Sequence, residues 1–170
     1  MNIMLDLETM GTAGDSAIIA IGAVAFDKNG VSSKFYTNVN LQSCIDLGMK
    51  VDGSTVIWWM GQSDQARSIF SDDSPRLNSA LIEFGNWFNN VSGNEVWGNG
   101  AAFDNVILST AYKKAGLVQP WNFWNDKCYR TVKGMHPSIK LNRVGTYHNA
   151  VDDAESQALH LIEIMRSRKA

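Results

Sequence analysis

Apolar and polar positions at the start of the chain follow the pattern of β-strands. A short strand-like run over residues 3–6 opens the chain, and residues 17–27 form a longer run, rich in Ile, Val and Ala, that suits a strand covered on both faces. The dipeptide Asn29-Gly30 is typical of a tight hairpin, and it connects this run to residues 31–39, where apolar and polar residues alternate. We therefore predict three antiparallel strands at the start of the fold.

The pattern then becomes helical. Residues 77–88 place four apolar side chains on one helix face, and Ser74, before Pro75, is the expected N-cap of this helix. A short strand over residues 95–97 follows, between glycine-containing segments.

Two further helices are expected in the second half of the chain. One runs from Phe103 to Ala115 and ends at Gly116, a residue type that commonly terminates helices. The other begins at Asp153 and continues to about residue 165, with apolar residues at helical spacing. Residues 121–140 between them are predicted to be loop with a short helix. This order of elements predicts an α/β protein with a mixed central sheet flanked by helices.

Length and composition narrow the class of protein. A chain of 170 residues that is 45% hydrophobic and 19% charged is expected to form one domain, residues 1–170, with its own core, which excludes disordered, collagen-like and low-complexity classes. The longest apolar run, residues 17–26, is half the length of a membrane span, and the first residues lack a basic signal region. With Cys44 and Cys128 expected as two reduced thiols, we predict a cytoplasmic protein without a membrane segment.

Charge is divided unevenly along the chain. Residues 1–85 hold five basic and ten acidic residues, whereas residues 86–170 hold ten basic and seven acidic ones. The segment 113–143 holds seven basic residues, with Trp121, Phe123 and Trp124 among them. Such a mixture fits a single-strand groove for a polyanionic partner, although the aromatic residues could equally cover a sheet edge or a dimer contact, and a charge run is usually a solvated face. Within it, Asp126 and Arg130 are expected to form a helix-surface ion pair.

Asp6 and Glu8 are the first candidates for chemistry. Residues two apart on a strand point to the same face, so both carboxylates are expected to leave the end of an apolar strand together. Neighbouring anions repel unless a cation lies between them, which makes the pair a candidate metal site. The alternative is that one carboxylate faces solvent or caps a turn.

Asp104 is the second candidate, because it lies at a strand-to-helix junction, where α/β sheets often place ligand sites. An aspartate in the first turn of a helix is also an ordinary dipole partner. The preceding glycines do not complete a nucleotide-binding motif, so a phosphate loop is excluded.

His148 and Asp153 are the third candidate, five residues apart around the start of the last helix. A carboxylate can hold a hard divalent cation while a nearby imidazole deprotonates a water. Taken alone, the histidine fits an ordinary loop residue, and Asp152 or Asp153 a helix N-cap.

Together, these segments resemble the DEDDh group of 3′–5′ exonucleases, which are DnaQ-like proteins with a ribonuclease H fold. The resemblance spans residues 3 to about 165 and rests on an ordered set of motifs: Asp6-x-Glu8, Phe103-Asp104 and His148-x-x-x-x-Asp153. The sequences of residues 6–11 and 99–104, together with Trp58-Trp59, look closest to the small phage and bacterial exonucleases of the exonuclease VIII and mycobacterial exoribonuclease-like subfamily. Met10 is a departure, because many relatives carry a second threonine there.

The resemblance implies a catalytic site. Two Mg²⁺ or Mn²⁺ ions would be held by four carboxylates, with His148 as general base for attack of water on the terminal phosphodiester. The implied metal ligands are Asp6, Glu8, Asp104 and Asp153. Asp6 is the expected bridging ligand, and Asp152 is expected to point away.

The resemblance also implies residues that recognise the 3′ end of single-stranded DNA or RNA. Thr9, Met10 and Gly11 would lie against the last sugar, with Met10 as an apolar wedge. Trp58 and Trp59 point about 100° apart on a helix, so one is a candidate base-stacking platform, while the alternative places one in the core and one at an interface. Asn99 and Phe103 complete the expected substrate residues.

The expected function is a metal-dependent 3′–5′ exonuclease that releases nucleoside 5′-monophosphates, with DNA as the first substrate and RNA as the second. The alternative from another class is a catalytically idle ribonuclease H-fold module that binds 3′ ends. Similar small exonucleases are often dimers, so the resemblance also allows a homodimer.

Overall fold

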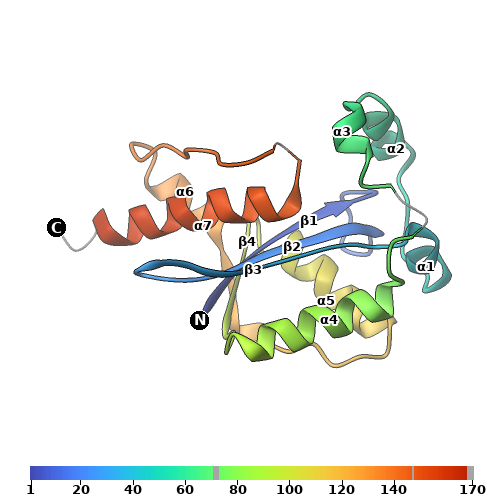
Figure 1. The fold of residues 1–170 in the computed structure, drawn as a ribbon, viewed down its shortest axis with the longest axis horizontal. Coiled ribbons are helices and arrows are strands. Elements are labelled where there is room, and N and C mark those ends of the chain that lie inside the picture. Colours follow the sequence, from blue (N-terminus) through green and yellow to red (C-terminus); the bar gives the residue numbers. More distant parts are fainter. Residues whose placement is uncertain (71–72, 147, 168–170) are drawn as a thin grey trace.

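The computed structural model describes residues 1–70, 73–146 and 148–167, and within them five strands form one mixed sheet between two layers of helices (Figure 1). The sheet order is β3-β2-β1-β4-β5. Strand β2 pairs antiparallel with both β1 and β3, whereas β4 pairs parallel with β1, and β5 pairs parallel with β4. This confirms the predicted α/β architecture with three antiparallel strands. The strand bounds are β1 Asn2–Thr9, β2 Ile18–Asp27, β3 Gly30–Asn38, β4 Glu95–Gly98 and β5 Asp126–Cys128.

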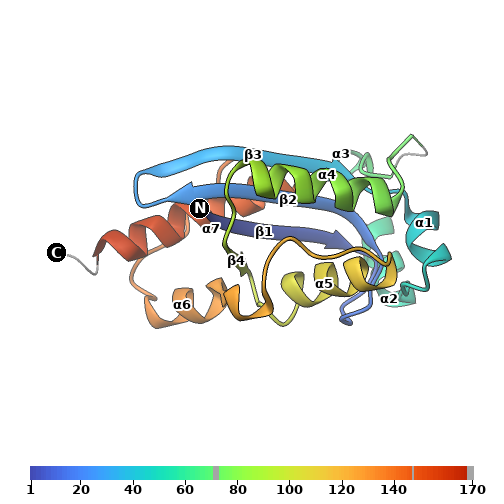
Figure 2. The same ribbon diagram turned by 90° about the horizontal axis from the view of Figure 1, so that it is seen from below.

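Helices cover both faces of the sheet. Helix α7 lies on one face with α6 beside it, and α4 and α5 cover the other face (Figures 1 and 2). Helices α1, α2 and α3 gather beyond the carboxyl end of β1 (Figure 1). The helix bounds are α1 Leu41–Asp46, α2 Gly53–Met60, α3 Asp64–Arg67, α4 Leu77–Asn90, α5 Asp104–Lys114, α6 Tyr129–Met135 and α7 Ala150–Ser167, with a 3₁₀ turn η1 at Phe123–Asn125. No helix in the described part of the chain has the length and apolar character needed to cross a membrane.

The alternation along β1 sends its side chains into two separate apolar layers. Ile3 and Leu5 belong to the cluster under α4 and α5, whereas Met4 belongs to the cluster formed with α7. Because side chains alternate across a strand, Asp6 and Glu8 continue the Met4 side, the face that α7 covers. The core therefore orients the two carboxylates.

Two predicted helix starts are wrong. Helix α4 begins after Arg76, and the backbone N–H of Leu77 donates to Ser43 Oγ of α1 at 2.9 Å, so a tertiary contact takes the capping role expected of Ser74. Helix α7 begins at Ala150 rather than at Asp153, because Asn149 Oδ1 accepts hydrogen bonds from the first backbone N–H groups of the helix. Asp153 consequently lies inside the first turn.

The segment 121–140 contains the expected short helix, α6, and also a strand that the sequence pattern did not predict. Strand β5 has only three residues, Asp126–Cys128, and pairs with β4 in parallel. Its polar sequence lacks both an apolar run and a clear alternation, so only its pairing partner defines it.

Candidate metal centre

A close approach between β2 and α7 places the start of the last helix next to the first strand of the chain. Gly22 of β2 pairs with Asp6 of β1, and a Cβ atom on Gly22 would lie 2.2 Å from the backbone carbonyl carbon of Ala150. Only glycine leaves room for the helix start at this position. The first turns of α7 therefore lie over the part of β1 that carries the acidic side chains, and they place Asp153 and Gln157 there.

Asp104 is held at the same end of the sheet by backbone hydrogen bonds. Its Oδ1 accepts from the N–H of Leu7 at 3.2 Å, and its Oδ2 accepts from the N–H of Asn99 at 3.0 Å. Gly98, the last residue of β4, permits this fold-back, because a Cβ there would lie 3.2 Å from the Asp104 Cβ and 2.3 Å from Asn105 Oδ1. The strand-to-helix junction thus buries a carboxylate beside β1.

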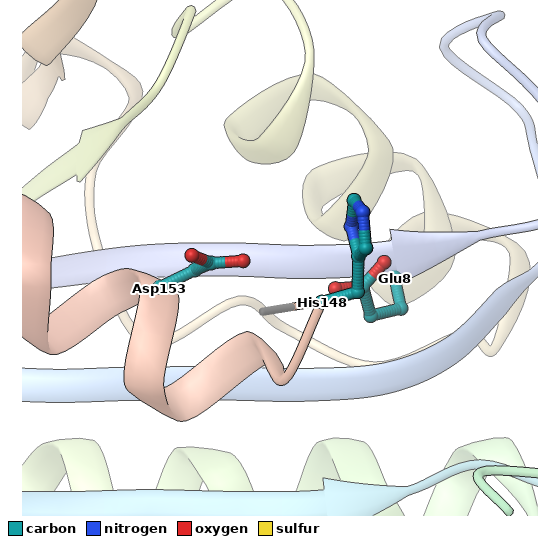
Figure 3. Close-up of side chains that lie close together, drawn as sticks. All are labelled: Glu8, His148 and Asp153. Atoms are coloured by element: carbon teal, nitrogen blue, oxygen red, sulfur yellow. The ribbon is translucent and has the colours of Figure 1, made fainter. Parts of the chain in front are cut away.

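His148 stands next to two of the carboxylates. Within the described residues, Glu8, His148 and Asp153 each offer a ligand atom, and these atoms lie within 4.8 Å of one another. Figure 3 shows the three side chains coming from β1, from the segment before α7 and from the first turn of α7. His148 has a positive φ of 59°, a conformation uncommon for residues other than glycine and often found at functional sites. The imidazole also meets the Trp58 ring edge-on, with a centroid separation of 5.2 Å.

The carboxylates perturb one another strongly. Burial raises the pKa of Asp6 well above its usual range, and the charges of Asp104, Glu8 and Asp153 raise it further. Burial raises the pKa of Glu8 to about 8, with contributions from the Asp153 and Asp104 charges. Burial also raises the pKa of Asp104 to about 7, against backbone hydrogen bonds that favour its charged form. Burial and neighbouring charges therefore disfavour the ionisation of Asp6, Glu8 and Asp104.

This donor set fits hard divalent cations. Carboxylate oxygens are the ligands that Mg²⁺ and Mn²⁺ prefer, and cations would offset both the burial and the like-charge repulsion that raise the pKa values of Asp6 and Glu8. Among the described residues, the buried Oε1 of Gln157 has no hydrogen-bond partner, although its Nε2 donates to Asp6 Oδ1 at 2.8 Å. An unused acceptor and a cluster of anions together fit a hydrated cation.

A pocket of about 450 Å³ opens beside the carboxylates. Its lining includes the catalytic candidate Glu8 and the predicted substrate residues Thr9, Gly11, Trp58, Trp59 and Phe103. Met10 lies outside this lining and is only 4% exposed, packed in the apolar cluster under α4 and α5. Asn99 also lies outside the lining, and its backbone holds Asp104 instead.

The two adjacent tryptophans have different surroundings. Trp59 is 3% exposed, and its Nε1 donates to the carbonyl oxygen of Thr9 at 3.0 Å. Trp58 is 45% exposed and meets His148 and Trp59 edge-on. Trp59 thus secures the strand end, and Trp58 presents an aromatic surface to the pocket.

The basic segment is organised differently from its sequence prediction. Asp126 lies in β5, where its Oδ1 accepts from Asn105 and Trp121, so the predicted ion pair with Arg130 is wrong. Arg130 Nη2 instead donates to the carbonyl oxygen of Asn99 at 2.6 Å, beside the Asp104 junction. Asp126 is partly buried, and buried polar atoms need hydrogen-bond partners, which Asn105 and Trp121 provide.

The aromatic residues of this segment are divided between core and surface. Trp121 is buried in the core with Phe84, Phe88 and Tyr112. Phe123 and Trp124 are exposed just before β5, and the parallel pairing places that strand start at the opposite end of the sheet from Asp6. The three aromatic residues therefore do not form one groove.

Two residues of the site escaped the sequence analysis. Arg143 contacts Asp153 through Nη1, but sequence spacing does not predict which of seven basic residues reaches the carboxylates. Gln157 had a detectable signal, because residues four apart on a helix share a face and Asp153 precedes it by four.

Two comparisons of the sequence with known proteins found matches over most of the chain. A family profile described as "Rv2179c-like: 3′-5′ exoribonuclease Rv2179c-like domain" matches residues 1–165. A protein of Enterobacteria phage T4 named "Exodeoxyribonuclease" is 26% identical over 162 residues, covering 76% of this chain and 69% of that one.

Solved structures show the same fold at low sequence identity. The nuclease domain of 3′hExo, a DEDDh family member bound to rAMP, has a TM-score of 0.66 and 14% identity, covering 98% of this chain and 92% of that one. Exonuclease X in complex with 5′ overhanging duplex DNA has a TM-score of 0.63 and 16% identity, covering 100% and 94% of the two chains.

Proposed function

The chain belongs to the family of 3′–5′ exoribonuclease Rv2179c-like domains, and from that premise we propose that it removes nucleoside 5′-monophosphates from the 3′ ends of single strands. It is a 3′–5′ exonuclease of the DEDDh group. The gathering of His148 with four carboxylates beside one pocket is the observation that carries the proposal.

Asp6, Glu8, Asp104 and Asp153 would hold two Mg²⁺ or Mn²⁺ ions. When bound, such ions help to activate an attacking water and to stabilise the charge that develops on the leaving 3′ oxygen. Asp6 has the central place in this set, because the other three carboxylates all raise its pKa. Asp104 is oriented by two backbone N–H groups before any ligand arrives.

His148 is proposed as the general base. Its ring lies beside Glu8 and Asp153, so a water among these groups is within its reach. The edge contact with Trp58 restricts rotation of the ring. His148 would accept the proton of the attacking water, and the four carboxylates would hold the ions.

The pocket beside Glu8 would take the terminal nucleotide. Trp58 offers a face on which a base can stack without regard to its identity, and Thr9 and Gly11 lie near the strand end where the sugar would rest. The buried Met10 does not support the wedge role, so the apolar side of the pocket is assigned to Trp58 and Phe103.

DNA is the substrate proposed first, supported by the phage relative named an exodeoxyribonuclease. RNA is the second candidate, supported by the description of the matching family. The idle binding module is disfavoured, because all four carboxylates and the histidine are present and close together. A module that only binds has no use for such a costly cluster of acids.

The test uses 5′-labelled DNA and RNA oligonucleotides of one sequence, with Mg²⁺, Mn²⁺ or EDTA. We expect a ladder shortened from the 3′ end in either metal, no products in EDTA, and no products from oligonucleotides with a 3′-phosphate. Asp153→Asn should lose the ladder. Glu155→Gln removes another carboxylate of the same helix, one that pairs with Lys34 of β3, and should keep the ladder. Internal cleavage products, or activity in EDTA, would contradict the proposal, and the faster oligonucleotide identifies the sugar.

A further inference from the structure

Gln157 is a buried polar residue at the centre of the site that the proposed reaction does not use. It lies on α7 four residues after Asp153, on the same helix face, and is 5% exposed. Its Nε2 donates to Asp6 Oδ1 at 2.8 Å, which connects the last helix to the first strand across 151 residues of sequence.

The orientation of this amide follows from its partner. With cations bound, Asp6 is ionised and only accepts hydrogen bonds, so the amide nitrogen must face Asp6 and the amide oxygen must face away from it. In the part of the chain that the structure describes, Oε1 has no hydrogen-bond partner and is out of contact with solvent. Buried acceptors are nearly always paired in folded proteins, so this oxygen indicates a donor that belongs to the working site.

We propose that Gln157 is a positioning residue of the metal centre, an inference that rests on the proposed two-metal function. Nε2 holds Asp6 through Oδ1, which leaves Oδ2 of the same carboxylate for the cations. Oε1 accepts a hydrogen bond from a water in the hydration shell of a cation. One amide would then orient a ligand and a water together, as residues that support metal ligands commonly do.

The packing around Gln157 argues against a merely structural role. Ala154, Ala158 and Leu161 already secure α7 against the apolar cluster that contains Met4. An aliphatic side chain at position 157 would bury similar area without a buried, unpaired amide oxygen, and it would remove only the hydrogen bond that Asp6 Oδ1 accepts. The amide is therefore better explained by the acids beside it than by the cohesion of the helix.

The experiment compares Gln157→Met, of similar length but without the amide, with Gln119→Leu as a matched control. Gln119 is half-buried and lines a different pocket, with Oε1 accepting from Ser109 at 2.6 Å and Nε2 donating to the Trp121 carbonyl oxygen at 2.9 Å. Calorimetry measures Mn²⁺ affinity and the number of ions bound, electron paramagnetic resonance reports the Mn²⁺ environment, and melting curves are recorded in EDTA and in Mn²⁺.

We expect Gln157→Met to weaken Mn²⁺ binding about 10- to 100-fold, the usual effect of losing a group that supports a metal ligand. Its melting temperature in EDTA should equal or exceed that of the wild type, so that the gain on adding Mn²⁺ shrinks. Gln119→Leu should lower both melting temperatures together and keep the wild-type affinity. Gln157→Leu serves as a second apolar variant if Gln157→Met does not fold.

The outcomes separate this inference from the function on which it rests. If the wild type binds no Mn²⁺, the proposed function fails. If the wild type and the Gln157 variants bind Mn²⁺ equally, only the positioning role is overturned, and a lower melting temperature in EDTA would then assign Gln157 to the fold.

Discussion

The two faces of the sheet differ in what they bury: one buries apolar side chains, and the other also buries carboxylates. The face under α4 and α5 is closed mainly by apolar side chains, with Phe84 in contact with the rings of Phe35, Trp87 and Phe88. The face under α7 begins in the same way at Met4 but ends in Asp6 and its acidic neighbours. The apolar face is stable without a ligand, whereas the acidic face needs bound cations to offset the repulsion among its carboxylates.

The comparison shows how a fold can hold an unfavourable cluster. Burial of the apolar face stabilises the domain, and dispersion and the hydrophobic effect act there without a ligand. The acidic face reduces stability in the absence of cations, because buried like charges repel and lose their hydration. The stable face thus supports the reactive face, an arrangement common at functional sites.

The largest expected effect is on the acidic face. Asp6→Asn removes the carboxylate that the other three perturb, and since ion catalysis contributes several kcal/mol, nuclease activity should fall about a thousandfold or more. Its melting temperature in EDTA should rise, because repulsion among the acids is relieved. Activity on a labelled oligonucleotide within tenfold of the wild type would contradict the metal role.

The apolar face should show the opposite behaviour. Phe84→Ala should lower the free energy of unfolding by about 3–5 kcal/mol, because it leaves a cavity among packed rings, while the folded protein keeps its Mn²⁺ affinity. Ile82→Ala, half-exposed on the same helix, is the control and should change stability by about 0.5 kcal/mol or less. Denaturant titrations measure both variants, and equal losses would show that the contrast between the faces is wrong.

A variant of His148 tests whether proton transfer and metal binding on the acidic face are carried out by different residues. His148→Ala should lower the rate about a hundredfold or more, the range expected for loss of a general base, with Mn²⁺ affinity retained. His136→Ala changes the C-cap residue of α6, which is not among the site residues, and should leave the rate unchanged. A loss of Mn²⁺ affinity as large as that of Asp153→Asn would instead identify His148 as a ligand.

Trp58 tests the border between the pocket and the apolar core. Trp58→Ala should weaken single-strand binding by about 1–3 kcal/mol, the usual contribution of one stacked base. Trp124→Ala removes an exposed tryptophan before β5, at the far end of the sheet, and should leave affinity unchanged. Fluorescence anisotropy in Ca²⁺ measures the single-strand affinity of both variants. Equal losses of affinity would mean that the binding surface extends to the start of β5.

The smallest effect concerns pH. The folded-state pKa values of Asp104 and Glu8, about 7 and about 8, exceed their ordinary values. The folded protein therefore retains protons that the unfolded chain releases above about pH 4, so stability decreases as pH rises through 7 and 8. Melting temperatures in EDTA should drop by a few degrees between pH 5 and 9, and Mg²⁺ should reduce that drop. A flat profile in EDTA would show that the acids do not interact as described.

Local patterns predicted the elements that form from their own sequence. The three antiparallel strands, the apolar face of α4, and α5, which ends at Lys114 just before Gly116, all follow from periodicity and residue type. The candidate ligands could also be named in advance, because the strand alternation pairs Asp6 with Glu8 and the resemblance orders the remaining acids.

Other features depended on partners distant in sequence. Strand β5 exists through its pairing with β4, Ser43 bonds the first N–H of α4, and Arg130 pairs with the Asn99 carbonyl oxygen rather than with Asp126. The roles of Met10 and Trp59 were likewise decided by burial. None of these contacts leaves a signal at fixed sequence spacing.

The sequence by itself determined the strands, the main helices and the types of ligand, because periodicity and side-chain chemistry are local properties. The tertiary structure decided which groups meet: Gly22 admits the start of α7, and Gln157 thereby reaches Asp6. The reason is that the free energy of a buried charge or hydrogen bond depends on its neighbours in space, and these are set by the packing of the whole domain.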